Sequence, residues 1–388
     1  MDFYTEPAFF VFVAPLVAVA VALGLTQRRM AGFGCVASLA MLALLFFRSP
    51  SALVYAACYI AVSIVLYRWV LGLFASKHPR AIPLYRVALA LQIAPLALYK
   101  VGVLFKPDFW GFLGISYITF KTVQVLIEVR DGLITDMTAG EYLYFLAFFP
   151  TFTSGPILRS RTFVADVRAG LTRDDYLDKL YRGLGWFVIG AAYKFVGSAL
   201  AQWGLWFVPS VVGVPALAWL AKVFFYGLDL FFDFAGYSDM AMGLGLLLGI
   251  EVPKNFHAPF VATDIKEFWD RWHMSLSTWL RDFVFMRFSQ YALSRKLLPS
   301  RTATACAGFV INMTLMGLWH GITLDYFVYG LYHGALLAGY HYYQQNSKFY
   351  KKHRRERWYR AASWAVTMVA VFFGFALFGG YVVSPLLG

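Results

Sequence analysis

The chain has 388 residues, of which 60% are hydrophobic, 19% aromatic and only 14% charged. This composition lies far outside the range of soluble domains and excludes an ordinary soluble enzyme. Because about 20 apolar residues are needed to cross a bilayer, the length allows roughly ten to twelve spanning helices and few other residues. We therefore predict an all-α polytopic membrane protein with a single membrane-embedded domain over residues 1–388.

The net charge of +13 is concentrated in short links between apolar runs. The basic links at residues 27–30 and 76–80 are two helices apart, so the positive-inside rule places both in the cytoplasm and the amino terminus outside. Residues 254–301 and 347–360 are cytoplasmic by the same rule. The cations suit acidic lipids or an acidic protein partner, and we expect no nucleic-acid partner. The first four apolar runs are residues 7–25, 32–47, 51–74 and 82–105.

Polar residues then enter the apolar pattern. Lys121, Gln124 and Glu128 recur on one helical face, which predicts an interfacial helix with satisfied polar contacts. Pro150 and the Gly155-Pro156 pair break the next apolar run. A broken backbone at membrane depth requires a covering of protein or a cavity.

Further spans are expected at residues 184–200 and 206–230, followed by three carboxylates among aromatic residues: Asp229, Asp233 and Asp239. Asp229 and Asp233 are one helical turn apart. They could pair with Lys or Arg from another helix, line a polar cavity or mark a helix end. A structural, ion-paired role is favoured over a catalytic one.

Residues 264–288 have an apolar stripe opposite a charged face, a pattern typical of an interfacial amphipathic helix or pair of helices with aromatics at headgroup level. His273 lies beside the stripe. On the residues alone we expect it to hold the segment in place, with a catalytic role as the alternative. The stripe consists of Phe268, Trp272, Leu276, Trp279, Phe283 and Met286, and the charged face of Lys266, Asp270, Ser277 and Arg281.

His320 ends the apolar segment 303–318, where packing alone gives no reason for a histidine. A neutral imidazole is the usual general base for deprotonating a hydroxyl, so we predict that His320 is catalytic. Gly317 is expected to leave room for substrate. Asn312, Trp319 and Ser275 are candidates for the substrate tunnel or oxyanion site, and no metal-ligand spacing accompanies His320.

Three motifs together resemble the membrane-bound O-acyltransferase family: Asp-Phe-Ala-Gly-Tyr-Ser-Asp at 233–239, Phe-Trp-Asp-Arg-Trp-His-Met-Ser-Leu-Ser-Thr-Trp at 268–279, and Leu-Trp-His-Gly at 318–321. The segments at 120–124, 128–132 and 281–288 are most similar to the D-alanyl transfer branch of the family in Gram-positive bacteria. The resemblance implies a ring of about eleven transmembrane helices around a central funnel. It also places the invariant family histidine on His320 and the second characteristic histidine on His273.

The resemblance further implies a donor and an acceptor on opposite sides of the cell membrane. The donor would be a D-alanyl thioester on the phosphopantetheine arm of a small acidic cytoplasmic carrier protein. The acceptor would be lipoteichoic acid outside, reached by way of a membrane partner protein. The chain then needs no bound cofactor of its own.

The basic segment 254–301 suits docking of an acidic carrier, and its candidate contacts are Arg281, Arg287, Phe288 and Arg295. Lipid headgroups are the alternative partner of this segment. Two other functions stay open: a polysaccharide O-acetyltransferase of the same family, and a lipid or polymer transporter with His320 as its proton-coupling site.

Overall fold

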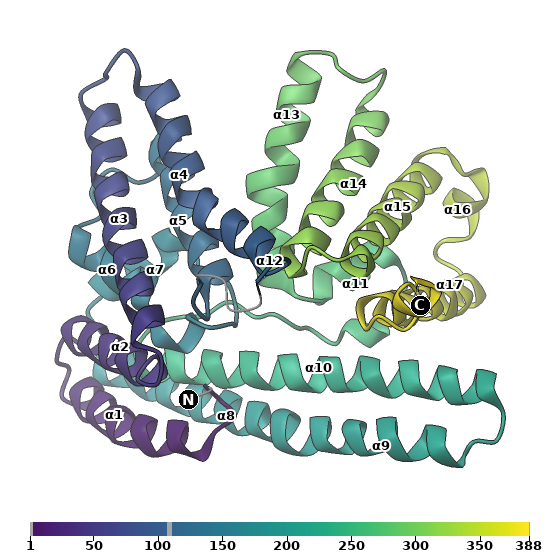
Figure 1. Cartoon of the computed structure of the whole chain (residues 1–388), viewed down its shortest axis with the longest axis horizontal. Helices are drawn as coiled ribbons and strands as arrows, with labels where there is room; N and C mark the ends of the chain where they lie inside the picture. Colours follow the sequence, from purple (N-terminus) through teal and green to yellow (C-terminus); the bar gives the residue numbers. More distant parts are fainter. Residues whose placement is uncertain (1–2, 107–110, 388) are drawn as a thin grey trace. The chain divides into compact units, whose positions relative to one another are not determined.

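The computed structural model describes residues 3–106 and 111–387, and within these ranges every regular element is a helix or helical turn (Figure 1). Seven of the described helices are long and apolar enough to cross a membrane. The chain is therefore a polytopic all-α membrane protein, as predicted, while the count of about eleven spans stays a prediction. The described residues form two compact units, one from Met1–Ala191 with Tyr237–Pro253 and the other from Ala192–Gly236 with Lys254–Gly388.

The first unit opens with the predicted hairpin series. The helix boundaries fall within a few residues of the four apolar runs, and each basic link forms the turn between two helices. Pro at the first position of α1 and α3 fits there because that N–H has no partner inside a helix. These helices are α1 (Pro7–Leu25), α2 (Ala31–Leu45), α3 (Pro50–Ala75) and α4 (Ala81–Gly102).

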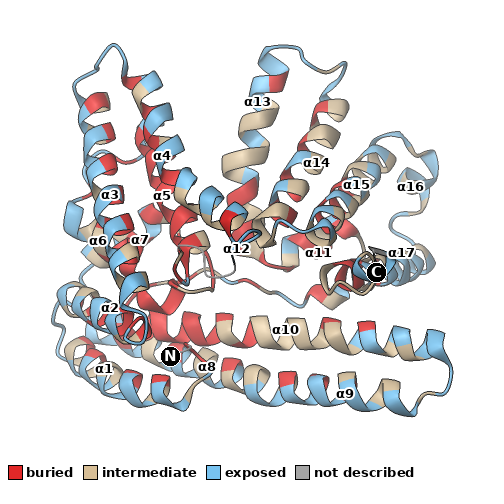
Figure 2. Cartoon of the chain, in the orientation of Figure 1, coloured by how far each residue is buried: buried red, intermediate tan, exposed pale blue. Residues whose placement is uncertain are grey.

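At the centre of this unit is α5 (Ile115–Arg130), which is buried along most of its length (Figure 2). The expected interfacial position is wrong, because α3, α4, α6 (Ala139–Ala147) and α7 (Ser160–Arg168) pack around it. The predicted polar contacts are present at both ends of the polar face, but the prediction is wrong for Gln124 between them, whose buried side-chain amide has no hydrogen-bond partner among the described residues. Lys121 Nζ donates to the Phe145 carbonyl at 3.0 Å, and Glu128 accepts from the Ser160 hydroxyl.

The break at Pro150 is covered by protein, as predicted. A capping box between Thr138 and Glu141 starts α6, which ends at Ala147, and a 3₁₀ turn follows at Phe149–Thr151. The freed Pro150 carbonyl accepts from the Tyr4 hydroxyl at 3.0 Å. The polar backbone of the break is therefore satisfied inside the first unit.

The break predicted between the spans at 184–200 and 206–230 is in the wrong place. α8 (Arg173–Ala192) continues through a π-helical turn (Tyr193–Gly197) into α9 (Ser198–Val211), and α10 (Pro215–Leu247) follows. The turn falls at residues 212–214, where Gly213 and Pro215 favour a break and the apolar pattern alone gives no signal.

In the second unit, α9 and the first part of α10 are held together by the polar residues that drew attention in the sequence. Lys194 forms an ion pair with Asp233. Asp229 accepts from Ser198 Oγ at 2.6 Å and from Gln202 Nε2 at 3.2 Å. The predicted pairing across helices is therefore confirmed for Asp233.

The second unit also contains a tightly packed hairpin of α14 (Arg301–His320) and α15 (Leu324–Asn346), which lie side by side in Figure 1. A Cβ placed on Gly317 would be 2.2 Å from the Tyr326 carbonyl oxygen and 3.0 Å from Gly330 Cα. The space beside Gly317 is thus filled by α15, so the expectation that it leaves room for substrate is wrong. Small residues here allow close helix packing instead. The remaining helices are α11 (Ile265–Arg271), α12 (Met274–Leu280), α13 (Met286–Ser294), α16 (Lys348–His353), α17 (Arg357–Phe378) and α18 (Ser384–Leu387).

Candidate functional site

The first histidine segment folds as a pair of helices broken at the histidine itself. α11 ends at Arg271 and α12 begins at Met274, with His273 between them in the left-handed region at φ 45°. Asn255, which the sequence reading did not single out, holds this break. Its backbone carbonyl accepts from Met274 N at 2.9 Å, and its side-chain oxygen accepts from Ser275 Oγ at 2.6 Å.

The first four residues of the apolar stripe lie inside the protein, whereas Phe283 is half-buried and Met286 is 47% exposed. Phe268, Trp272, Leu276 and Trp279 are each at most 5% exposed, so the expected position of these aromatics at headgroup level is wrong. Aromatic rings pack against one another to enclose the break. Trp272 stacks on Phe268 at 5.4 Å between ring centroids, and Phe234 meets the His273 ring edge-on at 4.6 Å.

The His273 side chain is enclosed and electrically neutral. It is 3% exposed, and its Nε2 atom has no hydrogen-bond partner among the described residues. Burial, followed by the nearby His320, holds the pKa of His273 well below its usual range. A neutral imidazole with an open nitrogen can accept or donate a hydrogen bond to a bound group without adding charge to the site.

His320 is the last residue of α14 and lies in an aromatic box. Its ring centroid is 4.7 Å from that of Trp319, 5.0 Å from Phe378 and 6.0 Å from Tyr326. Trp319 also lies 6.3 Å from the His273 ring. The second unit therefore brings the two histidines of the separate motifs close to the same tryptophan.

A cavity of about 390 Å³ lies beside these residues in the second unit. Met274, next to His273, lines it, and so does Met316, one helical turn before His320. Asn312, 9% exposed and with its Oδ1 atom unpartnered among the described residues, also faces the cavity. The other lining residues are Lys266, Trp269, Asp270, Leu276, Ser277, Thr278, Leu280, Arg281, Phe285, Phe309, Met313 and Leu337. The lining therefore combines mainly apolar side chains with three charged groups, two hydroxyls and one amide.

The remaining candidates differ in accessibility. Ser275 is 4% exposed and already donates its hydroxyl proton to Asn255. Arg281 is exposed and pairs with Asp282 at 2.9 Å, and Arg295 is exposed. Arg287 is half-buried over the Phe283 ring, and half-buried Phe288 packs near Gly308 of α14.

A third histidine, His333, contacts Trp269 of the cavity lining and was missed in the sequence. It is 1% exposed on α15, and its Nδ1 accepts from Trp269 Nε1 of α11 at 3.4 Å. A Cβ on Gly374 of α17 would lie 2.3 Å from His333 Nε2. The available signal was Gly374 itself, because a glycine inside a spanning helix marks a close approach.

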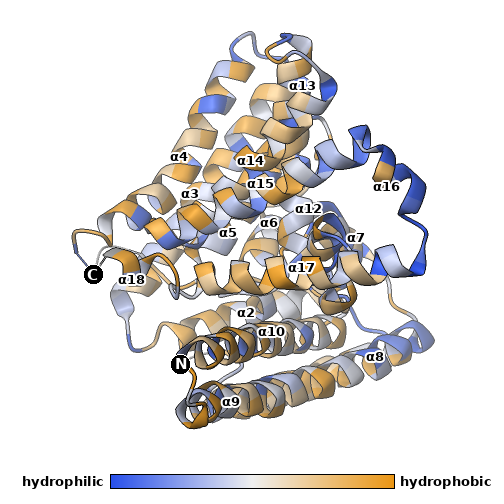
Figure 3. Cartoon of the chain, turned by 90° about the vertical axis from the view of Figure 1, so that its right-hand side faces the viewer, coloured by the Kyte–Doolittle hydropathy of each residue, from blue (hydrophilic) through white to orange (hydrophobic). Residues whose placement is uncertain are grey.

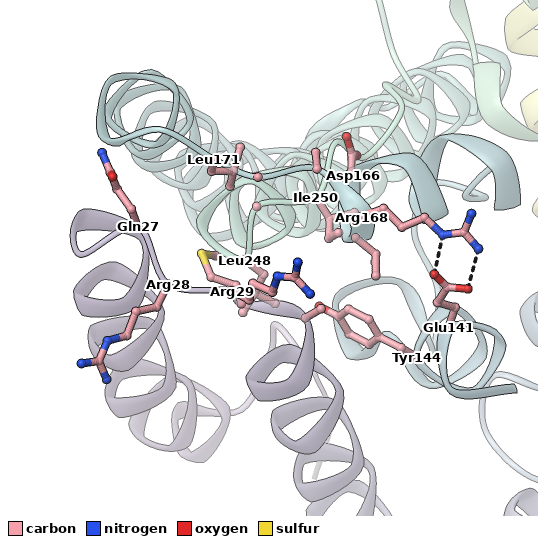
Figure 4. Close-up of a pocket in the computed structure, with 16 residues that line it drawn as sticks. Gln27, Arg28, Arg29, Glu141, Tyr144, Asp166, Arg168, Leu171, Leu248 and Ile250 are labelled. Carbon is pink, nitrogen blue, oxygen red and sulfur yellow. Dashed lines mark hydrogen bonds and ion pairs between the residues drawn. The ribbon is translucent and has the colours of Figure 1, made fainter. Parts of the chain in front are cut away.

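A cavity in the first unit, lined by several charged residues, has a different character. It measures about 590 Å³, and its described lining contains no histidine or cysteine. In Figure 4 the Arg168 guanidinium turns to Glu141, with Nε 2.5 Å from Oε1. Hydrogen bonding to Arg168 lowers the pKa of Glu141 to about 2. These groups tie α6 to α7 and lack a base suited to hydroxyl activation, so the histidine cavity is the stronger candidate.

Comparison with known proteins gives a consistent result. The model of the membrane-bound O-acyltransferase family matches residues 49–384. A teichoic acid D-alanyltransferase of Bacillus subtilis is 36% identical over 97% of the chain and 98% of its own length, and one from Streptococcus thermophilus is 35% identical over 97% and 95%. A probable alginate O-acetylase of Pseudomonas fluorescens is 34% identical, over 69% of the chain and 50% of its own length. The chain therefore belongs to the membrane-bound O-acyltransferase family.

Proposed function

We propose that this membrane O-acyltransferase transfers D-alanine from a carrier-protein thioester to lipoteichoic acid in a Gram-positive bacterium. The observation that carries the proposal is similarity along nearly the whole length of two teichoic acid D-alanyltransferases. The alginate O-acetylases match a smaller part of the chain and about half of their own length. Polysaccharide O-acetylation is therefore the second candidate.

In the proposed reaction, His320 is the general base. An imidazole nitrogen takes the proton of the acceptor hydroxyl, and the hydroxyl oxygen attacks the thioester carbonyl carbon. The carbon–sulfur bond then breaks, and the leaving thiolate takes the proton back from the imidazolium. An ester and a free thiol result, with no net gain of charge. This role suits a half-buried histidine at the end of a spanning helix, and a positioned base contributes about 10² to 10⁴ in rate.

His273 acts on the same site as the second histidine. Its buried, neutral ring presents an open Nε2 next to the aromatic box. It can orient the acceptor or the thioester by a hydrogen bond. Asn312 is the candidate for stabilising the oxyanion. Trp319, whose ring is close to those of both histidines, is the candidate for the tunnel wall.

The donor arm enters through the cavity beside these residues. The arm is a flexible chain that ends in the thioester, and the cavity is lined mainly by apolar side chains together with the charged side chains of Lys266, Asp270 and Arg281. The phosphopantetheine arrives on the carrier, so the chain itself binds no cofactor. Holding the thioester carbonyl near His320 converts the reaction into a step within one complex.

The decisive experiment uses purified protein in liposomes with two donors, a D-alanyl carrier thioester and an acetyl donor, and lipoteichoic acid as acceptor. D-alanyl ester formation supports the proposal. Acetyl transfer to a polysaccharide without D-alanyl transfer supports the second candidate. Movement of lipid or polymer across the bilayer without any acyl transfer would instead indicate a transporter.

The matched set of histidine variants sharpens this test. His320→Ala should abolish transfer while heat stability stays near wild type, and His273→Ala should reduce transfer less. His257→Ala makes the same change at an exposed position and should have no effect. Retained transfer in His320→Ala would remove this residue as the base, and equal complete loss in His273→Ala would contradict the ranking.

The carrier is proposed to dock from the cytoplasm on the charged residues of the cavity lining and on the basic segment 254–301. Arg295→Glu should slow association with the acidic carrier, and the effect should shrink as salt shortens the screening length to about 8 Å or less. Arg287 and Phe288 pack within the unit, so variants there need a folding control. Arg80→Glu is a charge-matched control at another exposed link. Unchanged carrier binding in Arg295→Glu and Arg281→Glu would move the docking site elsewhere.

The proposed topology places the amino terminus outside and the four basic segments in the cytoplasm, and the acceptor side carries the membrane partner protein. Single cysteines at Thr5 and Ser347, in a background without the three native cysteines, test it in intact cells. An impermeant reagent should label position 5 and spare position 347. The opposite pattern inverts the topology.

A further inference from the structure

Within the second unit, an apolar groove runs between α15 and α17. Its volume is about 500 Å³. On α17 its lining residues recur every three or four positions, from Trp358 through Ala362 and Val366 to Ala370, and so form one helical face. These twelve helical steps span about 18 Å at 1.5 Å per residue, more than half of a hydrocarbon core of about 30 Å. The α15 side contributes Ala335, Leu336, Gly339, Tyr340 and Tyr343.

The groove runs along a helix that is itself long and apolar enough to cross the membrane. Acyl chains lie in the same direction as spanning helices, so the groove has the orientation of a lipid chain. Its inner polar groups are satisfied within the protein. Tyr340 donates to Asp264 Oδ2 at 2.9 Å, and Tyr359 donates to the Tyr343 hydroxyl at 3.4 Å. The groove therefore offers mainly apolar contact to an occupant.

Aromatic rings surround the end of the groove next to α16. Phe349 lies 6.0 Å from both Trp358 and Tyr359, measured between ring centroids. Phe349 and Trp358 are 52% and 51% exposed. Exposed amphipathic aromatics at the end of a spanning helix are typical of the headgroup level of a bilayer. This end is therefore where a lipid headgroup would meet the protein.

A dense cationic cluster adjoins this aromatic end. Figure 3 shows α16 and the start of α17 as a hydrophilic segment beside the hydrophobic body of α17. All seven cations are exposed, and none forms a side-chain ion pair with the described residues. The nearby carboxylate of Glu356 is already occupied by His353, at 2.9 Å, and by the Trp358 N–H. The cluster consists of Lys348, Lys351, Lys352, Arg354, Arg355, Arg357 and Arg360.

We propose that this groove and the cationic cluster form a binding site for one anionic phospholipid. The acyl chain occupies the groove along α17, and the phosphate lies against the cations of α16. These cations have no ion-pair partner among the described residues, although Lys351 Nζ donates to the Gln345 carbonyl at 2.6 Å and Arg354 lies over the Tyr350 ring. Such cations at a membrane surface attract acidic lipids, whereas the groove supplies the apolar contact that a soluble phosphate cannot use. The apolar groove is about 18 Å long, which favours a lipid over an acidic protein as the occupant. An acidic protein could bind to the cations without any such groove.

The test is lipid binding to the full-length protein in neutral detergent, measured by native mass spectrometry and by lipid-dependent thermal stabilisation. Phosphatidylglycerol, phosphatidylcholine and glycerol 3-phosphate are the three probes. Phosphatidylglycerol should bind and stabilise most. Each lysine near an anionic surface changes affinity by about fivefold, so Lys351→Gln with Lys352→Gln should weaken it roughly 25-fold at low salt.

Two variants separate charge from groove. Lys77→Gln with Arg80→Gln removes the same charge from an exposed link of the first unit and should change binding less than twofold. Ala362→Phe fills part of the groove at an exposed position and should weaken the binding of phosphatidylglycerol, although all the cations are still present. Three results would each overturn the proposal. Phosphatidylcholine or glycerol 3-phosphate could bind as tightly as phosphatidylglycerol does. The control pair could lose as much phosphatidylglycerol affinity as the variant with Lys351→Gln and Lys352→Gln.

Discussion

Substituting Gly317 by alanine tests whether the position of His320 depends on the packing of α14 against α15. The added Cβ would lie 2.2 Å from the Tyr326 carbonyl oxygen, and ordinary contact begins at 3.4 Å, so the helices must separate by about 1.2 Å. Backbone atoms cannot rotate away as a side chain can. Overpacking of this kind costs about 1–3 kcal/mol. His320 is one helical turn further along α14, so the displacement reaches the proposed base.

A misplacement of about 1 Å can lower the rate of a positioned reaction about 10²-fold. We therefore expect Gly317→Ala to lower both the thermal midpoint in detergent and the rate of acyl transfer, the rate by roughly ten- to a hundredfold. Gly185→Ala is the matched control, because its Cβ would meet nothing within 4 Å in the middle of α8. Alanine is the better helix former by about 1 kcal/mol, so this control should be neutral or slightly stabilising. Equal stability and activity in the two variants would refute the reasoning.

Three further changes follow from described contacts. Asn255→Ala removes the acceptor of the buried Ser275 hydroxyl and should cost about 1–3 kcal/mol, with lower transfer and unchanged carrier binding; unaltered heat stability would contradict this. Because the pKa of Glu141 is held near 2, its ionic contribution to stability is present above its usual pKa and is lost as the pH falls toward 2. The thermal midpoint should thus drop more between pH 5 and pH 3 in wild type than in Glu141→Gln, and parallel curves would contradict it. Asp233→Asn should destabilise the protein more than Lys194→Met does, because it leaves the more buried charge of the pair without its partner: the Lys194 side chain is 15% exposed and that of Asp233 is 44% exposed. Unfolding in detergent measures the difference, and the reverse order would contradict it.

A segment of the fold could be predicted where its own residues, through their hydropathy or turn preference, determine its structure. The first four helices were correct because length and hydropathy determine a lipid-exposed span. The boundary between α9 and α10 was misplaced because both flanks are apolar and only Gly213 and Pro215 mark the turn. α5 was placed at the interface because its polar face resembles a surface, whereas its partners come from distant segments.

Those parts of the site that carry a local sequence signal were predicted, and those that depend on contacts between distant segments were not. His273 and His320 stand out because nothing in their apolar surroundings requires a histidine. The left-handed break at His273 and its support by Asn255 depend on residues that are 18 positions apart and carry no shared periodicity. Gly317 was assigned to substrate because a glycine leaves space on one helix. Whether another helix fills that space is tertiary information.

The neutrality of His273 has a consequence for the proposed reaction. An apolar aromatic enclosure disfavours charge, so a second histidine that stays unprotonated near His320 does not repel the imidazolium formed when the acceptor loses its proton. That cation is brief, because the departing thiolate is the complementary charge and removes the proton. An enclosed site therefore suits thioester transfer, since attack and departure restore electrical neutrality together. A charged residue replacing His273, such as lysine, should consequently impair transfer more than alanine does, and transfer assays at matched folding measure that order. Equal activity of the two variants would show that the charge at this position does not matter.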